Sequence, residues 1–278
     1  MVMQISCGLQ DNAIGLERSS GSLELEFSRQ AVRRFYQSGS AKAFLPLSHG
    51  EAMEVIFANT AGGLADGDVF SSNLNVVNES NLIATTQAAE RVYRALGRGR
   101  ASSHLVFNVA GNSKLCWLPH ETILYDGSHF SRRIEVSVDK SSCFVLGEIV
   151  VFGRQASGEV MTKGQLQDHW RIKRDGRLIH AEAFRMDGDI HRVLGDRAGA
   201  GDAGVMATLL MVGSEDLNPL MTTLRQLPTP DRAQIEVSSW EGKLVARILA
   251  PTLYQIKPSI GAMLEKMISS TLPRTWAL

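Results

Sequence analysis

A short loop rich in glycine and aspartate holds the residues whose types and spacing are best suited to chemistry. Residues 61–68 read Ala-Gly-Gly-Leu-Ala-Asp-Gly-Asp, and the three glycines give the backbone access to positive φ angles. Asp66 and Asp68 lie two positions apart, so on an extended backbone both carboxylates project to the same side. Paired carboxylates can exchange protons or bind a cation. This loop is therefore the first candidate for a functional site.

Motifs of several large enzyme classes are absent. The sequence contains no GxxxxGK(S/T) phosphate-binding loop and no GxSxG nucleophile elbow. Its seven histidines show no HxH or HExxH spacing. Cys7, Cys116 and Cys143 are widely spaced and form no CxxC pair. This pattern predicts free cysteines in a reducing cytosol and argues against a disulfide framework.

The composition predicts a globular protein without a strong electrostatic partner. The chain has 278 residues, of which 44% are hydrophobic, enough for a sizeable core. Lys plus Arg and Asp plus Glu both number 29, and this balance argues against a broad nucleic-acid binder. The first residues do not resemble a targeting signal, and no apolar run is long enough to span a membrane. We expect one domain over residues 1–278 and a cytoplasmic location.

The elements that must position these residues are mostly strands. Residues 23–27 alternate apolar and polar side chains, and residues 134–138 do the same, as half-buried strands do. Residues 142–152 are almost continuously apolar and predict a strand covered on both faces. Asp175-Gly176 and Glu241-Gly242 each separate two strand-like runs and predict hairpins. Tight bends are expected at three further glycines, Gly147, Gly153 and Gly158.

The last third of the chain predicts two helices. One covers residues 217–227 and is followed by prolines at 228 and 230. The other covers residues 259–270, where apolar residues recur at helical spacing. The sequence shows no internal repeat and no long linker. The prediction is thus a mainly β fold with two α-helices near the C-terminus.

Four segments together resemble one known family. They are the loop at 61–68, the TTQAAERVYR segment at 85–94, the WLPHETILYDG segment at 117–127 and the GEIVVFGRQASGE segment at 147–159. In this order and spacing they are similar to the urease accessory protein D family (UreD, or UreH), over residues 15–275. The chain departs from the family at Thr60-Ala61, where proline is usual, and at His120, where glutamine is frequent. Glu90 or Arg91 stands in place of the usual lysine, and Asp68 matches the family's acidic position better than Asp66.

The resemblance implies a urease maturation factor and not an enzyme. Members of the family act with UreF and the GTPase UreG on the urease apoprotein, whose active site receives nickel. Their fold is a β-helix-like stack of many strands with two helices. No cofactor is expected to stay bound, and nickel(II) is expected as a transient cargo in an internal passage. Neither a nucleic acid nor a membrane is expected as a partner.

The resemblance also nominates residues. A passage should offer scattered weak ligands that release the ion, since a tight cage would retain it. Candidates for the nickel path are the acids Asp68, Asp126, Glu148 and Glu159. Candidates for passage-lining or structural polar residues are Asp66, Thr85, Thr86, Gln87, Tyr93, Arg94 and Arg154. The stripe Ile260, Met263, Leu264 and Met267 is the candidate UreF interface, and part of it is expected to be exposed in the isolated chain.

Two other readings of the same residues stay open. Asp66, Asp68, Glu148 and Glu159 on a strand-rich scaffold could supply the carboxylate pair of a glycoside hydrolase. An aromatic content of 6% speaks against that reading, because sugar clefts commonly use exposed aromatic side chains. The other reading is a plain protein-binding β scaffold without metal traffic.

Overall fold

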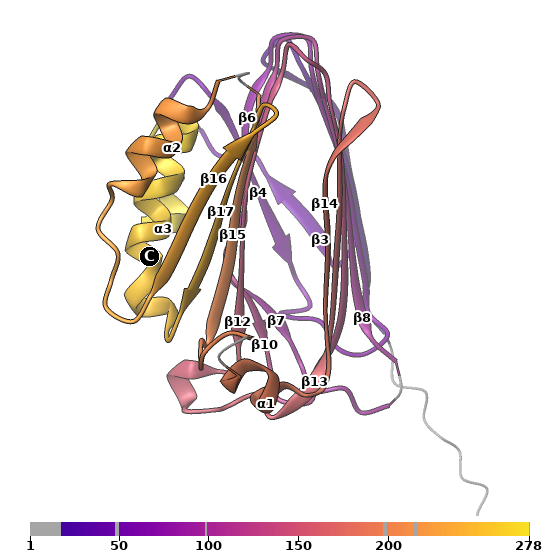
Figure 1. Ribbon diagram of the computed structural model, residues 1–278. Coiled ribbons are helices and arrows are strands. Elements are labelled where there is room, and N and C mark those ends of the chain that lie inside the picture. The colour runs from indigo at the N-terminus through magenta and orange to yellow at the C-terminus, as the bar shows by residue number, and fades with distance from the viewer. Residues whose placement is uncertain (1–17, 48–49, 98, 197–198, 214–215, 278) are drawn as a thin grey trace, which may run out of the picture.

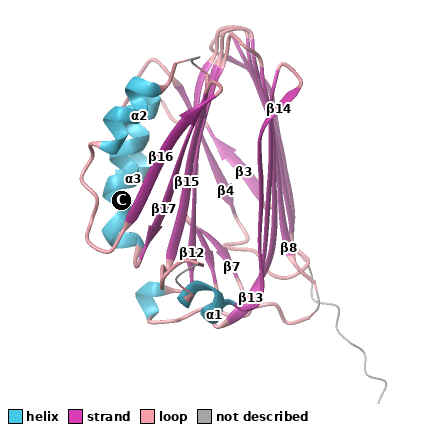
Figure 2. Cartoon of the chain, in the orientation of Figure 1, coloured by secondary structure: helices cyan, strands magenta, loops and turns pink. Residues whose placement is uncertain are grey.

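Two large β-sheets face each other, and two helices cover the outer face of one of them (Figures 1 and 2). The computed structural model describes residues 18–47, 50–97, 99–196, 199–213 and 216–277. Cys7, and with it the prediction of a free thiol there, lies outside the described residues. Cys116 and Cys143 are free cysteines, as expected.

The first sheet has seven strands. Their order across the sheet is β14 (Arg177–Asp189), β13 (Lys163–Arg174), β11 (His129–Val138), β8 (Ala101–Ala110), β5 (Val69–Val77), β1 (Ser20–Ser28) and β2 (Ala31–Gly39).

The second sheet carries the helices. Its order is β16 (Gln234–Trp240), β17 (Lys243–Ala250), β15 (Val205–Val212), β12 (Cys143–Phe152), β9 (Lys114–Leu118), β6 (Asn81–Thr86), β4 (Met53–Asn59) and β3 (Ala41–Phe44). Two short strands, β7 (Glu90–Val92) and β10 (Thr122–Leu124), extend from β12. The helices are α1 (Ile190–Gly195), α2 (Asn218–Arg225) and α3 (Leu253–Ile268), with 3-10 turns at Gln155–Ser157 and Arg274–Ala277.

The chain winds between the two sheets as a β-solenoid. It passes from β4 to β5, back to β6 and β8, then to β9 and β11, and finally to β12 and β13. Strands of successive coils pair in parallel within each sheet. Apolar residues at matching register positions stack between coils, as Leu74, Phe107, Val136 and Ile172 do. The predicted mainly β, β-helix-like stack is confirmed.

Both predicted hairpins are present. Asp175 and Gly176 have φ angles of 47° and 78°, and they join β13 to β14. Glu241 and Gly242 have φ angles of 49° and 71°, and they join β16 to β17. Two consecutive positive φ angles are the signature of the type I′ turn, whose twist matches that of paired strands.

The central strand β12 is buried along almost its whole length, because one of its sides faces the other sheet and the other side faces α3. The bend predicted at Gly147 is wrong, since this residue lies inside the strand. A Cβ atom there would lie 3.0 Å from Leu264 Cδ2 and 3.4 Å from Leu209 Cδ2. Glycine at this position therefore lets the helix approach the sheet. Gly153 and Gly158 do adopt positive φ angles, of 81° and 70°, as bends require.

Helix α3 begins six residues earlier than the sequence pattern predicts. Thr252 caps it by accepting a hydrogen bond from the Gln255 amide at 3.4 Å, and Ser269 ends it with a φ angle of 57°. Pro258 lies inside the helix and cannot donate a backbone hydrogen bond. Packing of the buried face of the helix offsets the missing backbone hydrogen bond. The helix therefore continues through Pro258 and does not begin there.

Candidate functional site

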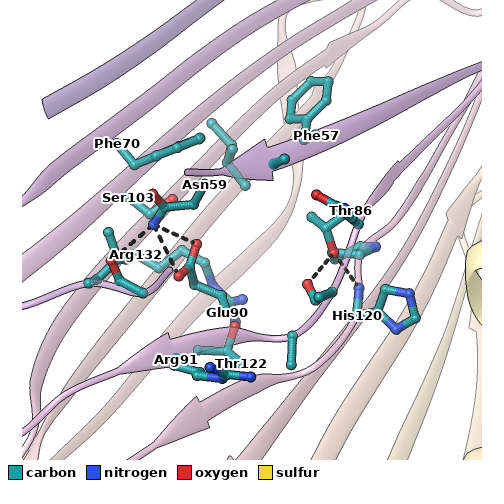
Figure 3. Close-up of a pocket in the computed structure, with 18 of the residues that line it drawn as sticks. Phe57, Asn59, Phe70, Thr86, Glu90, Arg91, Ser103, His120, Thr122 and Arg132 are labelled. Atoms are coloured by element: carbon teal, nitrogen blue, oxygen red, sulfur yellow. Dashed lines mark hydrogen bonds between the residues drawn. The ribbon is translucent and has the colours of Figure 1, made fainter. Parts of the chain in front are cut away.

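A cavity of about 210 Å³ lies between the two sheets (Figure 3). It reaches the surface at Gly62, Gln87 and Ala88, which are exposed. Its wall is partly apolar, with Phe57 and Phe70 among the lining residues. The polar side chains that line it are Asn59, Thr86, Gln87, Glu90, Arg91, Ser103, His120, Thr122, Arg132 and Glu148.

A buried cluster of three charged side chains adjoins this cavity, and two of them, Arg132 and Glu148, line it. Arg132 on β11 and Asp168 on β13 are direct register partners, and Glu148 on β12 reaches them from the opposite sheet. The guanidinium Nε of Arg132 donates to Asp168 Oδ1 at 3.1 Å, while its two terminal nitrogens form ion pairs with Asp168 and Glu148. Each of the three residues is at most 4% exposed. We call these residues the charged triad.

Two tryptophans complete the hydrogen bonding of the charged triad. Trp117 Nε1 donates to Glu148 Oε1 at 2.8 Å, and Trp170 Nε1 donates to Asp168 Oδ1 at 2.7 Å. Burial raises the pKa of Glu148, and the Asp168 carboxylate adds to that effect, while the guanidinium opposes it. The same two carboxylates outweigh burial at Arg132 and raise its pKa. The arginine is therefore a permanent cation held between two carboxylates.

A second, smaller cavity continues beyond the charged triad. Its volume is about 20 Å³, room for about one water molecule. Arg132 and Glu148 line both cavities, so the triad stands at their junction. The far side of the small cavity is lined by Glu182 on β14 and Arg247 on β17, which form an ion pair. Arg247 is exposed, so the polar interior approaches the surface between these two strands.

Glu90 is a second acid in the large cavity whose pKa is raised. Burial raises its pKa from an ordinary value of 4.5 to about 7, although Asn59 Nδ2 donates to both carboxylate oxygens at 3.3 and 3.4 Å. Figure 3 shows Asn59 and Glu90 facing each other in the pocket. Glu90 therefore changes its charge near neutral pH, at the wall of the cavity.

We expect Glu90→Gln to stabilise the protein at pH 8. The folded state holds a proton on Glu90 at pH values where the unfolded chain has lost it, so the free energy of unfolding falls as the pH rises from 4.5 to about 7. The shift corresponds to at most about 3 kcal/mol. Thermal melts should show a higher Tm for the variant than for wild type at pH 8 and no difference near pH 4. Glu51→Gln, at an exposed site, is the control, and an equal gain there would contradict this assignment.

His120 brings an imidazole to the same cavity. Its Nε2 atom is buried and has no hydrogen-bond partner, and its ring stacks on Trp276 with the centroids 5.7 Å apart. Burial lowers the pKa of His120, and the nearby Lys257 ammonium lowers it further. The imidazole is therefore neutral at physiological pH and leaves a nitrogen lone pair or N–H without a partner.

The four motif segments lie side by side on neighbouring coils. Leu64 forms a parallel bridge with Val92, β7 pairs with β10, and β10 pairs with β12. Of the residues predicted for the passage, Thr86, Gln87 and Glu148 line the large cavity. Thr85 is buried beside it and donates to the Leu118 carbonyl at 2.7 Å.

The two aspartates of the glycine-rich loop lie away from the cavity lining. Asp68 accepts hydrogen bonds from the Ser19 amide at 2.7 Å and from the Ala65 amide at 2.8 Å, one on each oxygen. Asp66 accepts from the Gly97 amide at 3.0 Å and pairs with Arg18 at 3.2 Å. Both carboxylates thus hold the loop in place.

The remaining predicted residues form a separate polar cluster. Asp126 Oδ1 accepts from Thr162 and Lys163, and Asp126 Oδ2 pairs with Arg94 at 2.9 Å. Burial would raise the pKa of Asp126, but these hydrogen bonds and the guanidinium hold it below its usual value. The other contacts of the cluster are Arg154 with Glu159 at 2.9 Å, Arg154 over the Tyr125 ring at 4.7 Å, and Tyr93 with the Gly62 carbonyl at 2.7 Å. Hydrogen bonds from Arg154 lower the pKa of Glu159.

Sequence reasoning missed Arg132, Asp168 and the titrating role of Glu90. A signal for the first two exists in the sequence. Arg132 lies between Phe130 and Ile134 in a period-2 pattern, so it occupies a core-facing position of its strand. Asp168 lies likewise between Leu166 and Trp170. A charge at an inward position must be paired.

The apolar stripe of α3 faces the sheet and not the solvent. Ile260, Met263, Leu264 and Met267 are each at most 1% exposed and pack in the core beneath the helix. The prediction that part of this stripe is exposed in the isolated chain is therefore wrong. Helix periodicity shows which residues share a face but not what covers it.

The geometry also bears on the alternative functions. Asp66, Asp68 and Glu159 do not line the cavity that Glu148 lines, so these acids form no common cleft for a sugar. Among the described residues, no group of three or more His, Cys, Asp or Glu side chains could hold a metal ion. In the same part of the chain, no helix is long and apolar enough to cross a membrane. The fold and site define a β-solenoid scaffold whose apolar core contains a cavity with polar side chains in its wall.

Comparison with known proteins agrees with this class. The family model described as "UreD urease accessory protein" matches residues 19–277. "Urease accessory protein UreD" of Rhodopseudomonas palustris strain BisB18 is 37% identical over 243 residues, which cover 87% of each chain. The protein of the same name from Chelativorans sp. strain BNC1 is 36% identical over 269 residues, 95% of each chain. The chain therefore belongs to the UreD family of urease accessory proteins, which are not enzymes, and it has a role in urease maturation.

Proposed function

We propose that this chain is a metallochaperone scaffold that acts with UreF and UreG to insert nickel into the urease apoprotein. Nickel(II) is its transient cargo, and no cofactor stays bound. The observation that supports the proposal most is the row of polar side chains along the two cavities in an otherwise apolar core. It extends from the mouth at Gly62 and Gln87, past the charged triad, to Glu182 and Arg247 at the other side.

The ligands in this interior suit an ion in transit. Nickel(II) binds imidazole nitrogen and carboxylate oxygen, and His120, Glu90 and Glu148 offer both kinds along one cavity. They belong to different elements and make no cage among the described residues, which favours release over retention. Of the acids nominated by the sequence, Glu148 is the one we place in the path, together with Glu90. For Asp68, Asp126 and Glu159 we propose structural roles, because none of them lines either cavity and each holds neighbouring backbone or side chains in place.

Reconstitution tests the proposed function directly. Urease apoprotein would be incubated with limiting nickel, bicarbonate, GTP, UreF and UreG, with or without this chain. We expect the nickel content of urease and its activity to rise well above background only when the chain is present. Equal nickel incorporation in both mixtures would rule out a maturation role for the chain in nickel insertion.

We place the UreF contact on the outward face of α3, since its inward face is buried. Tyr254 near the start of the helix is 92% exposed, an unusual position for a large aromatic side chain. We expect Tyr254→Ala to weaken co-elution with UreF about tenfold or more, as loss of an aromatic anchor does. Tyr36→Ala, on β2 and 48% exposed, is the matched control. Undiminished co-elution of the Tyr254 variant would place the contact elsewhere.

A further inference from the structure

Basic side chains gather at the tip of the hairpin that joins β13 to β14. The two strands supply most of them, and the loop after β11 adds one, held beside the turn by a hydrogen bond from the Lys140 amide to Asp175 Oδ1 at 3.1 Å. All of these side chains except that of Arg174 are exposed. The group, which we call the basic tip, consists of Lys140, Arg171, Lys173, Arg174 and Arg177.

We infer that the basic tip is a docking surface for an acidic surface of the urease apoprotein. The inference deepens the proposed function and rests on it, because it assigns one surface of the chain to one of the proposed partners. The basic tip belongs to the first sheet, whereas α2 and α3 cover the second sheet on the other side of the molecule (Figure 1). A partner at the basic tip therefore leaves the outward face of α3 free for UreF.

The positive charge of the basic tip is available to a partner. Two acids flank it, Asp139 and Asp175, and both accept hydrogen bonds from backbone amides. Glu135 on the neighbouring strand pairs with Arg133, which lies outside the tip. Among the described residues, no side chain of the basic tip forms an ion pair. In a chain without net charge, this local excess attracts an acidic surface and speeds its association.

An exposed leucine and a groove adjoin the basic tip. Leu178, directly after Arg177, is 49% exposed. The carbonyl of the next residue, Ile179, accepts a hydrogen bond from Lys243 Nζ, which lies 4.5 Å from the centre of the Trp240 ring. These last three residues line a groove of about 420 Å³ between β14 and the pair β16 and β17, and the groove shares Arg247 with the small cavity. A partner at the basic tip therefore lies beside the far end of the proposed passage.

This surface fits a protein better than a nucleic acid. A phosphate backbone is commonly bound along a continuous positive track, whereas the basic tip occupies one hairpin end and Glu236 interrupts the charge in the adjoining groove. Leu178 and Trp240, which is 45% exposed, instead suit the centre of a protein interface with a charged rim.

Charge reversal tests the inference. We would measure the binding of urease apoprotein to the complex of the full-length chain with UreF, for wild type and for the double variant Lys173→Glu with Arg177→Glu. Both side chains are exposed, so we expect the variant to fold. Its binding to the apoprotein should be weaker by about tenfold or more at low salt, because like charges then meet. The affinity of wild type should fall as salt is added.

The double variant Arg29→Glu with Arg33→Glu is the matched control. These arginines are exposed at the opposite edge of the first sheet, and their reversal changes the net charge equally. The control should bind the apoprotein as wild type does. Lys173→Met with Arg177→Met removes the charge without reversing it and should lose less affinity. Co-elution with UreF should be unchanged in every variant.

Two results would overturn the inference. One is equal binding of the apoprotein by wild type and by the folded Lys173→Glu, Arg177→Glu variant at low salt. The other is salt-sensitive capture of a DNA duplex by wild type that the same variant loses, which would assign the basic tip to a nucleic acid. Failure of the proposed function is a separate result, because it is read from nickel incorporation with and without the wild-type chain.

Discussion

Replacement of Asp68 by alanine lowers the stability of the protein by about 1–3 kcal/mol, because it leaves the half-buried amides of Ser19 and Ala65 without their partner. The carboxylate of Asp68 is 5% exposed and accepts from Ser19 and Ala65, which fixes the loop against the start of β1. Chemical denaturation of wild type and variant would measure the change. Asp68→Asn keeps one acceptor oxygen and should lose less.

The same variant separates a structural role from a place in the nickel path. At a temperature where the Asp68→Ala chain is still folded, nickel incorporation per folded molecule should equal that of wild type. Asp231→Ala, at an exposed position, serves as the control for stability. If the Asp68→Ala chain is stable but fails to deliver nickel, Asp68 is a residue of the nickel path and its role is not only structural.

Replacement of Gly147 by valine separates α3 from the sheet. A Cβ atom at this position already comes within 3.0 Å of Leu264, and the two further methyl groups have no space between β12 and the helix. Overpacking of this kind costs about 1–3 kcal/mol, and more where a helix must shift. We therefore expect a markedly lower denaturation midpoint and weaker co-elution with UreF.

The alanine variant at the same position is the graded control. Its single methyl group meets only the ends of the flexible Leu264 and Leu209 side chains, so a small loss is expected. Equal stability of Gly147→Val and wild type would show that the helix does not need this close approach.

The local elements could be predicted because local rules determine them. The alternation in residues 23–27 and the Asp175-Gly176 turn carry their own conformational preferences. The solenoid was expected only through resemblance. Corresponding positions of successive coils point inward alike but hold different residue types, as the stacked Leu74 and Phe107 show. For this reason the sequence shows no repeat.

The site was predicted only in part, for a physical reason. Glu148, Thr86 and Gln87 lie in recognisable motifs, and all three line the cavity. Arg132 and Asp168 lie in no recognisable motif. Their role can be seen only when Glu148, on the opposite sheet, is brought next to Arg132. Whether a carboxylate is free or occupied by amides, as at Asp68, likewise depends on contacts distant in sequence.

Two adjacent residues of strand β12 face the two different sides of the sheet, one toward α3 and one toward the interior. Gly147 faces α3, and the next residue, Glu148, faces the interior, because successive side chains of a strand point to opposite sides. One side of the strand therefore packs against the helix, and the other side carries a carboxylate of the charged triad. The contact of α3 with the sheet and the ion pair of Glu148 with Arg132 are therefore made by two residues joined by one peptide bond.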